Sequence, residues 1–209
     1  YIHNRRTGDK LHYAKLISNT YRKFAVMLLL SMIPTVAIGF TARRLVPLAA
    51  ASRLIPGAGI LITGVVLLVA DLSRLGGNKA ARDADYGSAM WIGICQGLSV
   101  FPGLSRSGLT ISTGLMGGFS RTFAVKYSYI LSIPAVTGAL VMELGEFAAP
   151  EMTVGMGFAY IFGMIISGVT GCFVIRFLLK IVQKGKLRHF AYYCFFAGFV
   201  SLALSYLVL

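Results

Sequence analysis

Residues 86–120 read YGSAMWIGICQGLSVFPGLSRSGLTISTGLMGGFS, and this stretch decides how the chain folds. Its only charged residue is Arg106, which separates two uncharged segments, 86–101 and 107–120. As helices, these segments would be about 24 Å and about 21 Å long, whereas the hydrocarbon core of a membrane is about 30 Å thick. Since neither segment can cross alone, we expect a re-entrant helical hairpin over 86–120, with the tip FPGLSRS near mid-membrane.

The composition of the whole chain points to a membrane protein. Of its 209 residues, 56% are hydrophobic and 13% are charged, and the mean hydropathy is +0.76. A soluble domain carries about 25% charged residues, so the composition excludes a disordered chain and argues against a soluble globule. The net charge of +13 comes from basic residues in short loops between apolar runs, where topology signals and lipid contacts lie. We therefore expect membrane lipid, and no nucleic acid, as the partner.

The uncharged runs around the hairpin predict an all-α, polytopic membrane protein that forms one transmembrane domain over 1–209. Five runs are expected to cross once each: 24–40, 54–70, 127–142, 154–175 and 190–209. The basic loops are predicted to be cytoplasmic; they are 1–23, 71–85 and 176–189. The acidic break 143–153 and the linker 41–53 are then outside, although the linker holds three arginines.

The hairpin tip carries the candidate chemistry. A charge within a membrane segment is costly and marks function by default, and the planar guanidinium of Arg106 matches phosphate oxygens bidentately. The first turn of the following helix would direct free N–H groups at the same point. The predicted catalytic residues are Arg106, Ser105, Ser107 and Thr110, and the predicted substrate-binding residues are Gly103, Gly108 and Gln96. The glycines let the backbone approach a ligand, and Gln96 either binds substrate or stabilises the hairpin. The competing interpretation is that Arg106 pairs with a buried carboxylate or with carbonyls and only holds the hairpin together.

The stretch QGLSVFPGLSRSGLTIS, residues 96–112, resembles a family signature. Pro102 to Thr110 match every fixed position of Pro-Gly-x-Ser-Arg-Ser-x-x-Thr, the second signature of the undecaprenyl pyrophosphate phosphatase (bacitracin-resistance) family. The chain is similar to the later portion of that family only. The resemblance implies an earlier re-entrant segment with a Glu-rich motif, a Ser-Ser pair and a His, and nothing in 1–85 matches it. We expect this segment upstream of Tyr1.

The resemblance also implies an activity. The enzyme would be an integral membrane phosphatase that hydrolyses undecaprenyl pyrophosphate, recycles the lipid carrier for peptidoglycan synthesis and confers bacitracin resistance. Its nucleophile, its general base and the ligands of an implied Mg²⁺ or Ca²⁺ belong to the first motif and are not assigned to residues of this chain. The expected location is the inner (plasma) membrane of a bacterial cell, with the active site open to the outer face. The resemblance leaves undecided whether two copies of the chain form a homodimer.

A different class of protein would also suit the tip residues. An arginine and hydroxyl groups bind phosphate equally well without cleaving it, and discontinuous helices around a mid-membrane anion site are a feature of transporters. The alternative function is therefore a transporter or flippase for a phosphorylated polyprenyl lipid or for phosphate.

Overall fold

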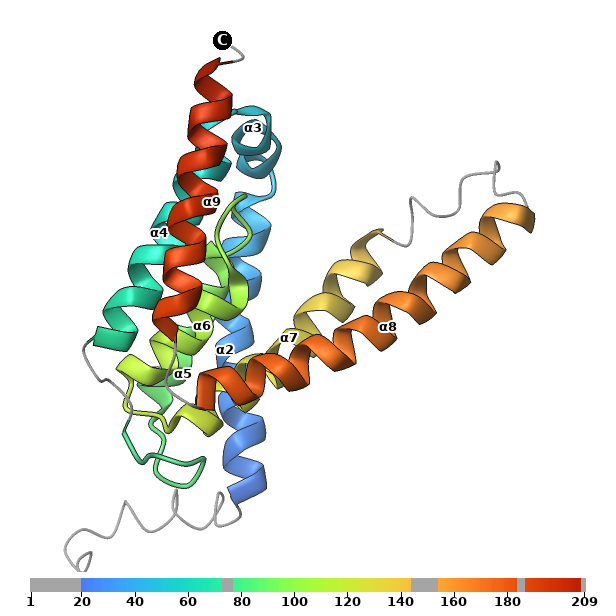
Figure 1. Cartoon of the computed structure of the whole chain (residues 1–209). Coiled ribbons are helices and arrows are strands. Elements are labelled where there is room, and N and C mark those ends of the chain that lie inside the picture. Colours follow the sequence, from blue (N-terminus) through green and yellow to red (C-terminus); the bar gives the residue numbers. More distant parts are fainter. Residues whose placement is uncertain (1–19, 73–76, 144–153, 184–186, 208–209) are drawn as a thin grey trace, which may run out of the picture.

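The computed structural model describes residues 20–72, 77–143, 154–183 and 187–207, and these residues are almost entirely helical (Figure 1). The helices are α2 (Thr20–Ala42), α3 (Leu45–Ala51), α4 (Leu54–Leu72), α5 (Tyr86–Leu98), α6 (Arg106–Met116), α7 (Arg121–Glu143), α8 (Val154–Gln183) and α9 (Leu187–Leu207). The described residues contain no β-strand beyond a single bridge between Lys79 and Phe119.

Five of these helices are long and apolar enough to cross a membrane: α2, α4, α7, α8 and α9. They contain the predicted spans, except that residues 208–209 of the last one lie outside the described residues, and the expectation of an all-α, multi-pass protein is confirmed. The predicted loop 176–189 was placed too early, because α8 continues as helix to Gln183. Arg and Lys are good helix formers, and their long side chains reach polar surroundings from a helix end. Most of the predicted break 143–153 lies outside the described residues.

The short helices α5 and α6 lie between the long ones (Figure 1). Helix α5 packs against α2, and α6 packs against α4, which in turn lies along α9. Helix α7 contacts both α2 and α6. Figure 1 shows α8 and the C-terminal part of α7 leaning away from the other helices, so α8 is exposed along its spanning segment. The α5–α6 hairpin is thus held on two sides by membrane-spanning helices.

Hydroxyl groups join α2 to α5 along the hairpin's first half. Ser31 donates to the carbonyl oxygen of Ala89 at 2.7 Å, and Thr35 donates to that of Gly93 at 2.9 Å. A Cβ atom on Gly93 would collide with the carbonyl of Ser31, so this glycine allows the two backbones to approach. Close approach through small residues is a common way for helices to pack where water is absent.

Candidate active site

The two halves of the predicted hairpin are the helices α5 and α6, of 13 and 11 residues, joined by residues 99–105. Backbone hydrogen bonds connect the two ends of the hairpin: Lys79 donates to Gly118 at 3.2 Å, and Ser120 donates to Lys79 at 3.0 Å. The chain therefore leaves the hairpin beside the point at which it entered. A re-entrant segment requires this geometry, and both the re-entrant course and its depth in the membrane stay predictions.

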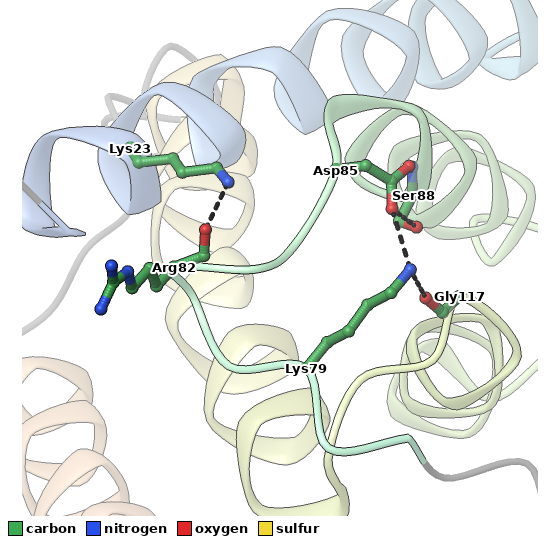
Figure 2. Close-up of polar contacts among 6 residues, drawn as sticks. All are labelled: Lys23, Lys79, Arg82, Asp85, Ser88 and Gly117. Atoms are coloured by element: carbon green, nitrogen blue, oxygen red, sulfur yellow. Dashed lines mark hydrogen bonds and ion pairs between the residues drawn. The ribbon is translucent and has the colours of Figure 1, made fainter. Parts of the chain in front are cut away.

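Side chains reinforce the base of the hairpin (Figure 2). The ammonium of Lys79 donates to the carbonyl of Gly117 at 3.2 Å and lies 3.5 Å from a carboxylate oxygen of Asp85. Asp85 caps the N-terminus of α5, accepting from the amide and the hydroxyl of Ser88 at 2.9 and 2.8 Å. Lys23 of α2 donates to the carbonyl of Arg82 at 2.6 Å. The loop before α5 is thus fixed to α2 and to the end of α6.

We expect the Asp85 cap to stabilise the protein in a pH-dependent way. The amide of Ser88 donates to the carboxylate and holds the pKa of Asp85 below its ordinary value of 3.8. Because the folded-state pKa is the lower one, this stabilisation is complete above pH 3.8 and is lost as pH falls through the folded value. Asp85→Ala should lower the free energy of unfolding by about 1 kcal/mol at neutral pH.

Unfolding midpoints of the wild type, Asp85→Ala and Asp85→Asn, measured from neutral pH to about pH 3, check this expectation. Asn caps helices about as well as Asp, so the Asn variant separates the cap from the charge. A gap between wild type and Asp85→Ala that stays constant as the carboxylate is protonated would contradict the assignment.

The backbone of the hairpin tip rests directly on α4. Gly103 has φ +88°, and a Cβ atom there would collide with the carbonyl of Pro56. On the opposite side of the contact, a Cβ on Gly59 would lie 2.6 Å from the carbonyl oxygen of Pro102. Glycine is needed at both positions, at Gly103 also because L-residues rarely adopt a positive φ. The close approach that the structure shows for Gly103 is to α4, and its approach to a ligand stays a prediction.

Arg106 begins α6 and is the centre of the predicted site. Its side chain is half-buried, and among the described residues no carboxylate or carbonyl forms an ion pair or hydrogen bond with its guanidinium. The next residue, Ser107, is exposed. Ser105 caps the helix by accepting from the amide of Gly108 at 3.2 Å, which leaves its own proton free to donate. If Arg106 were an internal anchor, its guanidinium would need a carboxylate or carbonyl partner, and the described residues supply none.

Two predicted site residues lie deeper in the protein than the tip. Thr110 is 1% exposed, and its hydroxyl donates to the carbonyl of Arg106 at 2.8 Å and lies 2.6 Å from the hydroxyl of Ser128 on α7. Gln96, on α5, is 2% exposed, and neither polar atom of its amide has a hydrogen-bond partner among the described residues. An unpartnered buried polar group costs about 1–3 kcal/mol. Direct phosphate contacts by Thr110 and Gln96 stay predictions.

The structure therefore gathers most of the predicted residues at one place. Gly103, Ser105, Arg106, Ser107 and Gly108 form the tip and the first turn of α6. Sequence reasoning missed Thr63 and Ser128, which contact this turn from α4 and α7. The only signal for Thr63 was a single hydroxyl in the apolar run 54–70, and Ser128 was one of several hydroxyls in 127–142. Such hydroxyls usually bond to their own helix.

A divalent cation does not fit the described residues. No three His, Cys, Asp or Glu side chains lie together among them. Asp71 is paired with Arg121 and Arg188, and Asp85 with Lys79. Mg²⁺ and Ca²⁺ prefer several carboxylate or carbonyl oxygens, so no catalytic step is assigned to a metal ion here.

These features define a class of protein: a multi-pass helical membrane protein with a short, arginine-bearing helical hairpin between its spans. Residues 3–200 match the family described as "Bacitracin resistance protein BacA", and the chain belongs to this family. The resemblance of residues 96–112 to this family's signature is thereby confirmed.

Relatives from other organisms carry the name undecaprenyl-diphosphatase. The protein from Korarchaeum cryptofilum is 37% identical over 196 residues, which cover 94% of this chain and 72% of that protein. The protein from Desulforapulum autotrophicum is 36% identical over 182 residues, covering 86% of this chain and 64% of the relative. The protein from Alkaliphilus metalliredigens is 35% identical over 196 residues, covering 91% and 69%. The chain thus spans about two thirds of the length of these relatives.

Proposed function

We propose that this chain supplies the phosphate-binding half of an undecaprenyl-diphosphatase, a membrane enzyme that converts undecaprenyl pyrophosphate into undecaprenyl phosphate and phosphate. The observation that carries the proposal is Arg106, whose guanidinium stands at the N-terminus of α6 without an internal partner among the described residues. Family membership and the names of the relatives support the same activity. The physiological role would be the recycling of the lipid carrier for peptidoglycan synthesis, with bacitracin resistance as a consequence.

In the proposed overall reaction, the terminal phosphoryl group is transferred to water, the bond between its phosphorus and the bridging oxygen breaks, and undecaprenyl phosphate leaves with that bond's electron pair. Phosphoryl transfer depends mainly on positioning and on stabilisation of the developing charge. Arg106 would bind phosphate oxygens through its planar fork as charge moves to the leaving group. Ser105 and Ser107 would donate hydrogen bonds, and the first turn of α6 would add its backbone N–H groups. Thr110 would support this turn from within, through its bond to Ser128.

The nucleophile and the general base are not assigned to residues of this chain. The dependence on Mg²⁺ or Ca²⁺ that the family resemblance implies is kept as a prediction. The formation of a homodimer is likewise kept as a prediction.

Phosphate release from undecaprenyl pyrophosphate in reconstituted liposomes tests the proposed function. We expect inorganic phosphate and undecaprenyl phosphate to appear in equal amounts. A transporter or flippase would instead move the lipid between leaflets with its pyrophosphate intact. That result, with no phosphate released, would overturn the proposed hydrolysis in favour of transport.

We also propose that the hairpin enters from the cytoplasmic side of the plasma membrane and that its tip opens toward the outer face. The basic loop at the hairpin's base supports this orientation. The paired ends, Lys79 and Phe119, support entry and exit on one side.

Site-directed labelling tests the re-entrant topology. In a variant without the three natural cysteines, we introduce Asp83→Cys or Thr122→Cys, one before and one after the hairpin, both at exposed positions. We expect an impermeant maleimide to label both from the cytoplasmic side only. Ala50→Cys, exposed on α3, is the control that should label from outside. Labelling of positions 83 and 122 from opposite sides would contradict the re-entrant hairpin.

A further inference from the structure

A single hydroxyl group on α4, that of Thr63, contacts the hairpin tip from behind. The Thr63 side chain is 1% exposed. Its Oγ1 atom accepts a hydrogen bond from the amide of Ser105 at 3.0 Å. The same atom has two acceptors for its own proton, the carbonyls of Gly59 at 3.0 Å and of Gly103 at 3.3 Å. The hydroxyl therefore bridges the backbone of α4 and the backbone of the tip.

The contact is made at the residue that immediately precedes α6 and caps it. Ser105 is the N-cap, and among the described residues its amide has no acceptor other than Thr63. The methyl group of Thr63 also lies against the first turn, since a Cβ on Gly108 would lie 3.2 Å from Thr63 Cγ2. Thr63 thus touches the residues on both sides of Arg106 and Ser107. The backbone at Arg106, from which its side chain extends, and the first N–H groups of α6 cannot shift without disturbing this contact.

A purely intrahelical role does not explain these contacts. Threonines in apolar helices commonly donate to the carbonyl four residues earlier, and the bond from Thr63 to Gly59 is of this kind. That bond uses the hydroxyl's proton. The lone pair of the oxygen that faces the hairpin is then available to accept from Ser105, which lies 42 residues later in the chain.

We propose that Thr63 is a positioning residue of the phosphatase site: its hydroxyl fixes the Ser105 amide and so holds Arg106 in register with the phosphate oxygens of the substrate. This inference rests on the proposed function. Catalysis by a positioned group is sensitive to placement, and a displacement of about 1 Å can cost roughly a hundredfold in rate. Because the Thr63 contact is one neutral hydrogen bond, we expect a smaller loss, about tenfold, when it is removed.

Three variants separate the hydroxyl from the shape of the side chain. Thr63→Val keeps the volume and removes the hydroxyl, and Thr63→Ser keeps the hydroxyl. Thr137→Val is the matched control, because Thr137 makes the same intrahelical bond, to Ile133 at 2.9 Å, on an exposed face of α7. We expect kcat per folded molecule to fall about tenfold in Thr63→Val with little change in KM. Thr63→Ser should restore most of the rate, and Thr137→Val should match the wild type.

A double variant tests whether Thr63 acts through Arg106. If it does, adding Thr63→Val to Arg106→Lys should cause little further loss, because the group being positioned is already gone. A merely structural role would lower the thermal unfolding midpoint in both backgrounds and multiply the two losses in rate. The proposal would be overturned if the losses in rate of the two single variants multiply in the double variant, or if Thr63→Val turns over normally.

An activity-independent readout keeps this inference separate from the proposed function. Phenylglyoxal modifies accessible arginines, and mass spectrometry gives the modification rate at Arg106. We expect that rate to rise severalfold in Thr63→Val and to stay unchanged in Thr63→Ser and Thr137→Val. If the wild type releases no phosphate, the proposed function fails, and this rate alone decides whether Thr63 positions Arg106. An unchanged rate in Thr63→Val would overturn the proposal.

Discussion

Arg106→Lys, introduced into the gene that encodes this chain, should reduce phosphate release per folded molecule by about a hundredfold or more. Lysine keeps the positive charge but loses the planar fork of donors that matches two phosphate oxygens. Removing one preorganised donor to a developing anion typically costs roughly 10²–10³ in rate. Since Arg106 has no internal partner among the described residues, the thermal unfolding midpoint should change little.

Turnover and unfolding midpoint, measured on the same preparation, separate the two interpretations of Arg106. If the guanidinium only anchors the hairpin, Arg106→Lys should unfold at lower temperature while its folded fraction turns over normally. Ser105→Ala should show a smaller loss, because its hydroxyl supplies a neutral donor and Arg106 a charged pair. Thr110→Ala should also show a smaller loss, because its hydroxyl supports the first turn of α6 through Ser128. Normal turnover in Arg106→Lys would refute its role in binding phosphate.

The second large effect is expected at Asp71, at the end of α4. Its carboxylate is 1% exposed and lies 3.0 Å from the Nε of Arg188, on α9, and 3.8 Å from a guanidinium nitrogen of Arg121, on α7. An acid at a helix C-terminus and bases at helix N-termini each oppose the helix dipole. The three charges compensate one another only when α4, α7 and α9 meet at this point.

Replacing both arginines with methionine should therefore lower the free energy of unfolding by about 3–5 kcal/mol, the cost of a buried charge without a partner. Adding Asp71→Leu to that double variant should recover most of the loss, since an apolar side chain of similar size does not need a partner. Denaturant titration in detergent micelles measures both variants. If the triple variant were as unstable as the double variant, the buried charge would not be the cause.

The spans could be predicted because they depend on uncharged length, which a sequence displays directly. The two apolar segments that are too short to cross correspond to the short helices α5 and α6, and their re-entrant course stays a prediction. The predicted start of the loop 176–189 was wrong, since α8 continues to Gln183, because basic residues signal a membrane boundary but do not end a helix. The short helix α3 within 41–53 was not predicted.

The chemistry assigned to the hairpin tip stays a prediction, and the residues that support the tip were not predicted from the sequence. Charge, hydroxyls and glycines marked the tip around Arg106 because such residues are rare in membrane segments. The partners Thr63 and Ser128 lie 43 residues before and 22 residues after Arg106, and only the packing of α4 and α7 against α6 brings them together. Gly103 was expected to face a ligand, and its contact with Pro56 of α4 could not be seen from local sequence.

Protection of Arg106 by bound lipid tests the central claim most directly. The protein is treated with phenylglyoxal with and without a non-hydrolysable methylene bisphosphonate analogue of undecaprenyl pyrophosphate, and mass spectrometry follows each arginine. We predict that the analogue slows modification of Arg106 at least severalfold, while Arg82, exposed in the loop before α5, reacts at the same rate in both samples. Equal modification of Arg106 with and without bound analogue would contradict the assignment of the hairpin tip as the pyrophosphate site.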